Sequence, residues 1–144
     1  MKIEASITLN LKIPELTEAV IVANRLAMRD TVVEVAGDTV KGSPWLTGNN
    51  ARSIAYEVGP GGEFAQEDLT GAVYSTSGYG GFLEVGTNPH IIRVKTAKVL
   101  TDGESFFGKE VHHPGTKPHP YFKPALDKNF TLEKFTEKVQ SHLK

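Results

Sequence analysis

Residues 79–90, Tyr-Gly-Gly-Phe-Leu-Glu-Val-Gly-Thr-Asn-Pro-His, constrain the fold more than any other stretch of the sequence. Three glycines separate two aromatic and two aliphatic residues in this segment. Glycine at that density marks places where the backbone turns with positive φ or approaches another backbone closely. The apolar side chains between the glycines must then fill a core from a short, tightly bent segment. We therefore expect a junction between secondary-structure elements here rather than a solvated loop.

Glu84 is the single carboxylate within this apolar segment. Such a carboxyl group could act as a general acid, because apolar surroundings favour its protonated form. No second carboxylate lies at a spacing typical of paired acid–base catalysis. We therefore favour a buried acid whose oxygens accept hydrogen bonds from backbone N–H groups.

Strict alternation of apolar and polar residues runs from Ile3 to Ile13. A period of two residues indicates a strand with one buried face. Residues 1–13 are therefore predicted to hold one long N-terminal strand, which Pro14 ends.

A long helix is predicted to follow this strand. Glu15 and Glu18 occupy its first turn, where the helix dipole favours negative charge. Lys41 lies in the last turn, and Gly42 follows as a helix-ending residue. The stripe expected to face the sheet consists of Ala19, Val22, Leu26, Val33, Ala36 and Val40.

Turn-rich residues 43–50 link this helix to the next strands. Trp45, the only tryptophan, could anchor a binding partner, but closing one end of the core is the role that we favour, since tryptophan is highly buried on average. Strands are predicted over residues 54–58 and 69–75. The glycine-rich and polar segment 60–68 between them is expected to be a mobile loop.

The C-terminal half predicts a further strand over residues 91–95 and a hairpin that turns at Asp102-Gly103. Three prolines then follow within seven residues, so segment 101–119 is expected to form a mobile loop or arm. A C-terminal helix is predicted from Tyr121 onward. These elements describe a single α+β domain, in which a mostly antiparallel sheet packs against one long N-terminal helix.

Composition excludes several classes of protein. The chain has 144 residues, no cysteine and a net charge of −1. Disulfide scaffolds and thiol catalysis are therefore excluded, and the absence of a polybasic tail weakens the case for general nucleic-acid binding. No apolar run approaches the ~20 residues that span a bilayer, and no signal-peptide pattern opens the chain. A soluble protein made in a cytoplasm, without membrane contact, is expected.

Histidines are the strongest catalytic alternative. A metal-dependent hydrolase needs three converging ligands with an open fourth position. Adjacent histidines in a strand point to opposite faces, so His112 and His113 do not readily share a metal. No mechanistic metal motif or serine-nucleophile motif is present, so we expect no cofactor, no metal and no catalytic residue. The candidate ligands of the alternative are His90, His112, His113, His119, Glu84 and Glu110.

Three blocks, spanning about two-thirds of the chain, carry a resemblance to a known family. They are Ser43-Pro44 with Thr47-Gly48 and Ser53-Ile54; Tyr79 to Thr87 with Pro89-His90, Arg93 and Lys95; and His113 to Thr116 with Pro120 to Phe122 and Pro124 to Leu126. In these blocks the chain resembles the small head–tail joining proteins of long-tailed bacteriophages, also described as tail-completion or neck proteins. The signature residues, which the resemblance implies to be structural or interfacial, are Tyr79, Phe82, Glu84, Gly86, Thr87, His113, Pro114, Gly115, Thr116, Pro120, Phe122 and Pro124.

The resemblance implies a structural protein of the virion, assembled in the host cytoplasm, and no enzyme. Such proteins form rings, here expected to be hexameric or dodecameric, between the capsid connector or stopper and the tail-tube protein. DNA would pass through the lumen only as cargo, and a near-neutral chain would avoid trapping it. The alternatives are the metal-dependent hydrolase and a DNA-binding accessory factor of packaging.

Overall fold

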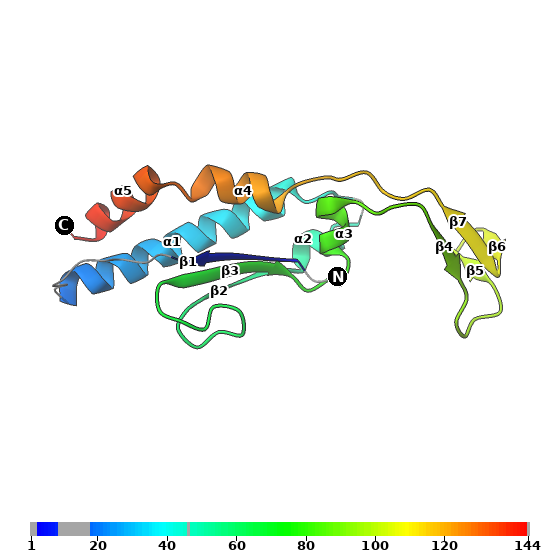
Figure 1. Ribbon diagram of the computed structural model, residues 1–144, viewed down its shortest axis with the longest axis horizontal. Helices are drawn as coiled ribbons and strands as arrows, with labels where there is room; N and C mark the ends of the chain where they lie inside the picture. Colours follow the sequence, from blue (N-terminus) through cyan, green and yellow to red (C-terminus); the bar gives the residue numbers. More distant parts are fainter. Residues whose placement is uncertain (1–2, 9–17, 46, 144) are drawn as a thin grey trace.

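The computed structural model describes residues 3–8, 18–45 and 47–143 of the chain. The fold is α+β, with antiparallel sheets, a long N-terminal helix and a helical C-terminus, as the sequence predicts (Figure 1). The elements in chain order are β1 (Glu4–Thr8), α1 (Glu18–Gly42), α2 (Asn49–Arg52), β2 (Ile54–Val58), β3 (Thr70–Ser75), α3 (Gly80–Val85), β4 (His90–Arg93), β5 (Leu100–Thr101), β6 (Phe106–Gly108), β7 (Glu110–His113), α4 (Phe122–Asn129) and α5 (Leu132–His142).

The main sheet is three-stranded and antiparallel, with the strand order β1-β3-β2. The predicted N-terminal strand is confirmed over Glu4–Thr8, and Ile3 directly precedes it. Residues 1–2 and 9–13 of the prediction lie outside the described ones, as does the predicted helix start at Glu15. Helix α1 packs against β2 and β3. A Cβ added at Gly71 of β3 would lie 2.1 Å from Val32 Cγ2. Glycine at this position therefore sets how closely the helix approaches the sheet.

The buried face of α1 is not the predicted one. Of the predicted stripe only Ala36 is buried, whereas Val22, Leu26, Val33 and Val40 are 38–43% exposed. Ala19 is exposed as well. The residues that α1 buries are Ala23, Asn24, Ala27, Met28, Thr31, Val32, Val35, Ala36 and Thr39.

The physical reason is that α1 is apolar on two sides. Two of its buried residues are threonines, and sequence patterns count threonine as polar. The hydroxyl of Thr31 donates to the carbonyl of Ala27 at 2.8 Å, and that of Thr39 donates to the carbonyl of Val35 at 2.7 Å. With the hydroxyls satisfied inside the helix, these side chains are buried without an unpaired polar atom. Periodicity alone could not tell which apolar side faces the sheet.

The connection between β2 and β3 is held by the carboxylate of Glu57. This carboxylate accepts hydrogen bonds from the backbone N–H groups of Phe64 at 2.9 Å and Ala65 at 3.3 Å, and from the Tyr74 hydroxyl at 3.2 Å. The first of these bonds is the main reason that the pKa of Glu57 lies below its ordinary value. Ala65 is 1% exposed, so the connection contributes to the core. The mobility expected of residues 60–68 stays a prediction.

The C-terminal helical region consists of two helices rather than the one expected. The break lies between α4 and α5 at Phe130 and Thr131. The Thr131 hydroxyl accepts a hydrogen bond from Lys134 N at 3.3 Å and so caps α5. Within the described residues, no helix combines the length and hydropathy needed to cross a membrane.

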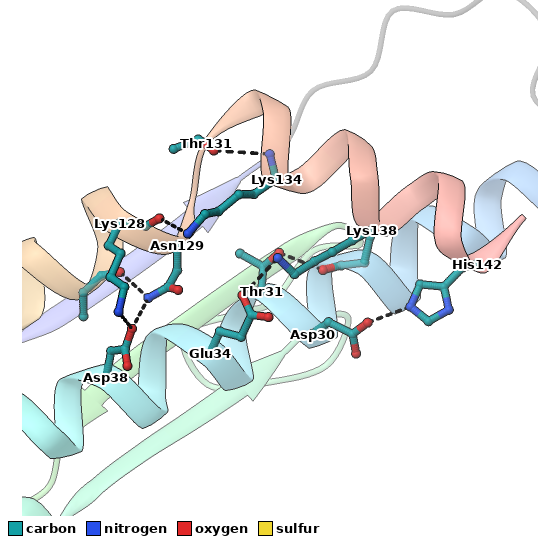
Figure 2. A network of polar contacts seen from close by, with 12 residues as sticks. Asp30, Thr31, Glu34, Asp38, Lys128, Asn129, Thr131, Lys134, Lys138 and His142 are labelled. Atoms are coloured by element: carbon teal, nitrogen blue, oxygen red, sulfur yellow. Dashed lines mark hydrogen bonds and ion pairs between the residues drawn. The ribbon is translucent and has the colours of Figure 1, made fainter.

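Polar side-chain contacts attach α4 and α5 to α1 (Figure 2). Asn129 of α4 donates a hydrogen bond to Asp38 of α1 at 2.8 Å, and this bond, with that from Lys128, lowers the pKa of Asp38. Three basic side chains of the C-terminal helices each have an acidic partner on α1. The pairs are Lys128–Asp38 at 3.1 Å, Lys138–Glu34 at 2.9 Å and His142–Asp30 at 2.6 Å.

The main sheet and the helices form the body of the fold. Residues 88–115 project from this body, and we call them the β-arm. Strand β4 pairs with β7, and β5 pairs with β6, each as a two-stranded antiparallel sheet. The predicted hairpin around Asp102-Gly103 is confirmed, whereas segment 101–119 is not simply a loop, because it contributes β6 and β7. The β-arm extends away from the body along the long axis of the molecule (Figure 1).

Candidate functional site

The root of the β-arm, where α3, α4 and the first arm strand meet, is the candidate functional site. Helix α3 is the junction predicted from residues 79–90, and it positions Glu84 against the first turn of α4. One carboxylate oxygen of Glu84 accepts hydrogen bonds from the N–H groups of Tyr121 at 2.7 Å and Phe122 at 2.9 Å, and the other from Lys123 at 3.1 Å. The predicted backbone donors are confirmed, whereas Glu84 is half-buried rather than buried.

This arrangement uses Glu84 as a helix cap supplied from a distant part of the chain. The first N–H groups of any helix lack internal partners and carry partial positive charge. A carboxylate satisfies them better than a neutral cap, because charge-assisted hydrogen bonds are stronger. Glu84 therefore connects α3 to α4 and fixes the angle at which the chain returns from the β-arm into the body.

Asn50 is the centre of a buried polar network beside this cap. Its side-chain oxygen accepts hydrogen bonds from Ser75 and Ser77, both at 2.8 Å. Its amide nitrogen donates to Ser43 and to the hydroxyl of Tyr121, both at 2.9 Å. Asn50 is 3% exposed, and all of its donors and acceptors are used. Sequence reasoning missed this residue, because Asn49-Asn50 looked like part of a turn.

Tyr121 extends the network to α3. Its hydroxyl donates to the carbonyl of Gly80 at 2.9 Å, and the residue is 2% exposed. Burial raises the pKa of this hydroxyl above its ordinary value. A Cβ added at Gly80 would lie 2.6 Å from the Ser75 side chain, so glycine is needed for the approach of α3. The signal for Tyr121 was present in the sequence only as the start of the C-terminal helix.

Two Gly-Thr pairs form a clasp where the β-arm leaves the body. Thr87 N donates to Thr116 O at 3.0 Å, and Thr116 N donates to Thr87 O at 3.1 Å. Gly86 has φ 75° and Gly115 has φ 87°, a region that favours glycine. A Cβ at Gly86 would lie 2.5 Å from Thr116 O, and one at Gly115 would lie 2.4 Å from Thr87 O. Four signature residues are thus brought together by reciprocal backbone contacts.

The histidines divide between two faces of the arm, as expected for adjacent residues in a strand. His113 stacks on His90 of the paired strand, with ring centroids 4.9 Å apart. Nδ1 of His113 accepts a hydrogen bond from Gly115 N at 3.0 Å. His112 lies on the opposite face, 3.5 Å from the Glu110 carboxylate. Among the described residues, no three histidine, aspartate or glutamate side chains converge as metal ligands.

An open hollow of about 570 Å³ lies against the stacked histidines. Its wall on the body side is Phe82 of α3, which is 40% exposed, and its wall on the arm side includes Ile92, which is 38% exposed. The surface is mainly apolar and carries few groups that could perform chemistry. The lining residues are Phe82, Gly86, Thr87, Asn88, His90, Ile92, His113 and Thr116.

The remaining signature residues lie around the same root. Phe122 is 3% exposed and belongs to the core, and Pro124 lies in the first turn of α4. The hydroxyl of Tyr79 accepts a hydrogen bond from Asn49 at 3.0 Å. Pro114 and Pro120 are exposed in the extended segment that returns to the body. The role of these residues at an interface stays a prediction.

Trp45 is not part of the core, contrary to the role that we favoured from the sequence. Its side chain is 70% exposed and lies across Gly48, where an added Cβ would meet the ring at 2.5 Å. A partner for this surface, the alternative considered for Trp45, stays a prediction.

Comparison of the chain with protein-family models, curated proteins and solved structures finds no match. The resemblance to head–tail joining proteins is therefore neither supported nor opposed by a relative.

Proposed function

We propose that this chain is a structural protein of the virion that joins head and tail in a long-tailed bacteriophage. In this proposal copies of the chain form a ring between the capsid connector or stopper and the tail tube, and DNA passes through its lumen. The signature residues support the proposal, because those from α3, the clasp and α4 meet at the root of the β-arm. They build the base from which the arm projects.

The observation that carries the proposal is the exposed, unsupported state of the β-arm. A two-stranded sheet on its own is marginally stable in water. The arm consists of two such sheets and exposes Ile91, Ile92, Phe106 and Phe107 by 38–77%. Apolar side chains on a thin projection gain stability when a neighbouring subunit covers them. An assembly of copies supplies that cover, whereas a catalytic role would leave the arm unexplained.

Genetic removal tests the proposal. Deleting the reading frame from the phage that carries it should leave filled heads and separate tails in electron micrographs, and expression of the chain in trans should restore joined particles. Joined, infectious particles without the chain would overturn the proposal. Metal analysis of the purified chain tests the alternative hydrolase, for which stoichiometric zinc would be the expected finding.

A further inference from the structure

Helix α1 carries a second apolar surface that nothing in the described chain covers. We call Val22, Leu26, Val33 and Val40 the outer stripe; they are 41%, 38%, 43% and 39% exposed. Intervals of four and seven residues place them on one side of the helix, opposite the buried side. Arg29 interrupts the stripe near its middle, and its guanidinium has no ion pair or hydrogen bond among the described residues. The stripe therefore combines apolar contact area with one uncompensated positive charge.

The far end of the β-arm offers the complementary chemistry. We call residues 102–107 the arm tip, where Phe106 is 77% exposed and Phe107 is 48% exposed. The Asp102 carboxylate shapes the turn by accepting hydrogen bonds from Glu104 N at 2.9 Å and Ser105 N at 2.7 Å. The side chain of Glu104 has no partner among the described residues. The arm tip therefore combines two exposed aromatic rings with acidic charge.

The outer stripe and the arm tip cannot meet within one chain. Helix α1 lies in the body, and β6 lies at the opposite end of the molecule (Figure 1). Two different surfaces that match each other but lie apart produce a heterologous contact between copies, which closes into a ring when the rotation allows it. Pairing of two outer stripes about a central two-fold axis would instead bring two Arg29 side chains together, and like charges disfavour it.

We propose that the arm tip of one copy packs on the outer stripe of the next copy, with Glu104 facing Arg29. This inference rests on the ring of the proposed function and names the two surfaces that build it. A helix of 25 residues is about 37 Å long. The outer stripe takes up about 27 Å of this length, so at a width of ~10 Å it offers on the order of 300 Å², well under half of the ~800 Å² per partner in a stable interface. The arm strands beside the tip must therefore lie along α1 and add their own apolar residues.

Cross-linking tests this contact directly, because the chain contains no cysteine. The variants F106C and V33C are purified separately, mixed and oxidised. A disulfide-linked dimer is expected in the mixture and not in either variant alone. The matched control mixes F106C with L132C, since Leu132 of α5 is 80% exposed but lies outside the outer stripe. No dimer is expected there.

Charge reversal gives a second measurement that does not depend on disulfide geometry. R29E or E104R alone should weaken self-association in analytical ultracentrifugation by roughly tenfold, because each places like charges together. The double variant should restore it. Circular dichroism checks the fold of each variant, and both side chains are exposed, so we expect no change.

Three outcomes overturn the inference. The first is a disulfide dimer of V33C alone, which indicates stripe-to-stripe pairing. The second is equal cross-linking in the control mixture. The third is a wild-type chain that stays monomeric at every concentration. The phage deletion separates this failure from that of the proposed function. Head–tail joining that depends on the chain, together with intact joining by R29E and E104R, would leave the function standing and remove only this contact.

Discussion

The body and the β-arm of this protein satisfy their polar and apolar groups in opposite ways. In the body, Asn50 uses every hydrogen-bonding position, Glu84 caps α4, and no described buried side-chain polar atom lacks a partner. In the β-arm, every residue of β4 and β6 is exposed. The body therefore encodes its own structure, whereas the arm has a surface suited to a neighbour. Substitutions in the body should therefore lower the free energy of unfolding, whereas similar substitutions in the β-arm should leave it nearly unchanged.

The largest effect is expected at Asn50. N50L removes four hydrogen bonds and leaves the Tyr121 hydroxyl and neighbouring serines with fewer partners. We expect a loss of about 3 kcal/mol in the free energy of unfolding, measured with urea. The control is N49A at an exposed neighbouring position, where a change below about 0.5 kcal/mol is expected. Equal losses in both variants would contradict the role of the network.

A smaller effect is expected at Glu84. E84Q keeps the shape but removes the charge and leaves one acceptor oxygen for the three N–H donors at the start of α4. We expect a loss of about 1.5 kcal/mol, because hydrogen bonds to charged groups exceed neutral ones by about that amount. The same substitution in the arm, E104Q, is the matched control and should leave the melting temperature of the monomer unchanged. A silent E84Q would show that the cap does not hold α4.

The body and the β-arm should also differ in how their carboxylates contribute to the pH dependence of stability. The pKa of Asp38 in the folded protein lies below its ordinary value because of hydrogen bonds from Asn129 and Lys128. A carboxylate with a depressed pKa stabilises the folded protein at pH values above its ordinary pKa of about 3.9. This stabilisation is lost as the pH falls through the lower pKa of the folded state. D38N should therefore reduce the change in urea midpoint between pH 7 and pH 3. Asp102 of the arm also has a lowered pKa, mainly through Ser105 N, but its bonds are local. D102N should leave the midpoint change of the body as it is in the wild type.

The smallest effect on stability is expected at the arm tip. F106S exchanges a ring that is 77% exposed for a small polar side chain. The free energy of unfolding of the monomer should change by less than about 0.5 kcal/mol. A measurement by differential scanning calorimetry at low protein concentration checks this. A large drop in stability would show that Phe106 packs within its own chain.

The sequence predicted β2, β3 and the partners of Glu84 well. Strand β2 has the predicted bounds, β3 begins one residue late, and Glu84 has the backbone partners expected of a carboxylate among apolar residues. Turn residues bound both strands closely, so their ends could be read from the sequence, although β3 is buried on nearly every residue.

The sequence-based predictions were wrong or incomplete where the sequence pattern allowed two structures or where the contact joined distant residues. Helix α1 is apolar on two sides, and two of its buried residues are threonines, so the wrong side was assigned to the core. The break at Thr131 depends on a cap that competes with continuation of the helix. The network around Asn50 joins residues far apart in the sequence, and no local pattern reports such pairings. The signature residues gathered at the arm root, but periodicity gave no sign of the Gly86–Thr116 contact.

The Gly-Thr clasp sets the direction of the whole β-arm through a few contacts at its base. Its direction depends on two backbone hydrogen bonds and on two glycines with no room for a side chain. The seven residues from Thr87 to Arg93 alone extend about 20 Å at ~3.3 Å each, so a rotation of about 10° at the clasp moves their far end by about 4 Å. A methyl group at Gly86 or Gly115 would therefore leave the strands of the β-arm paired but change the orientation of the arm relative to the body.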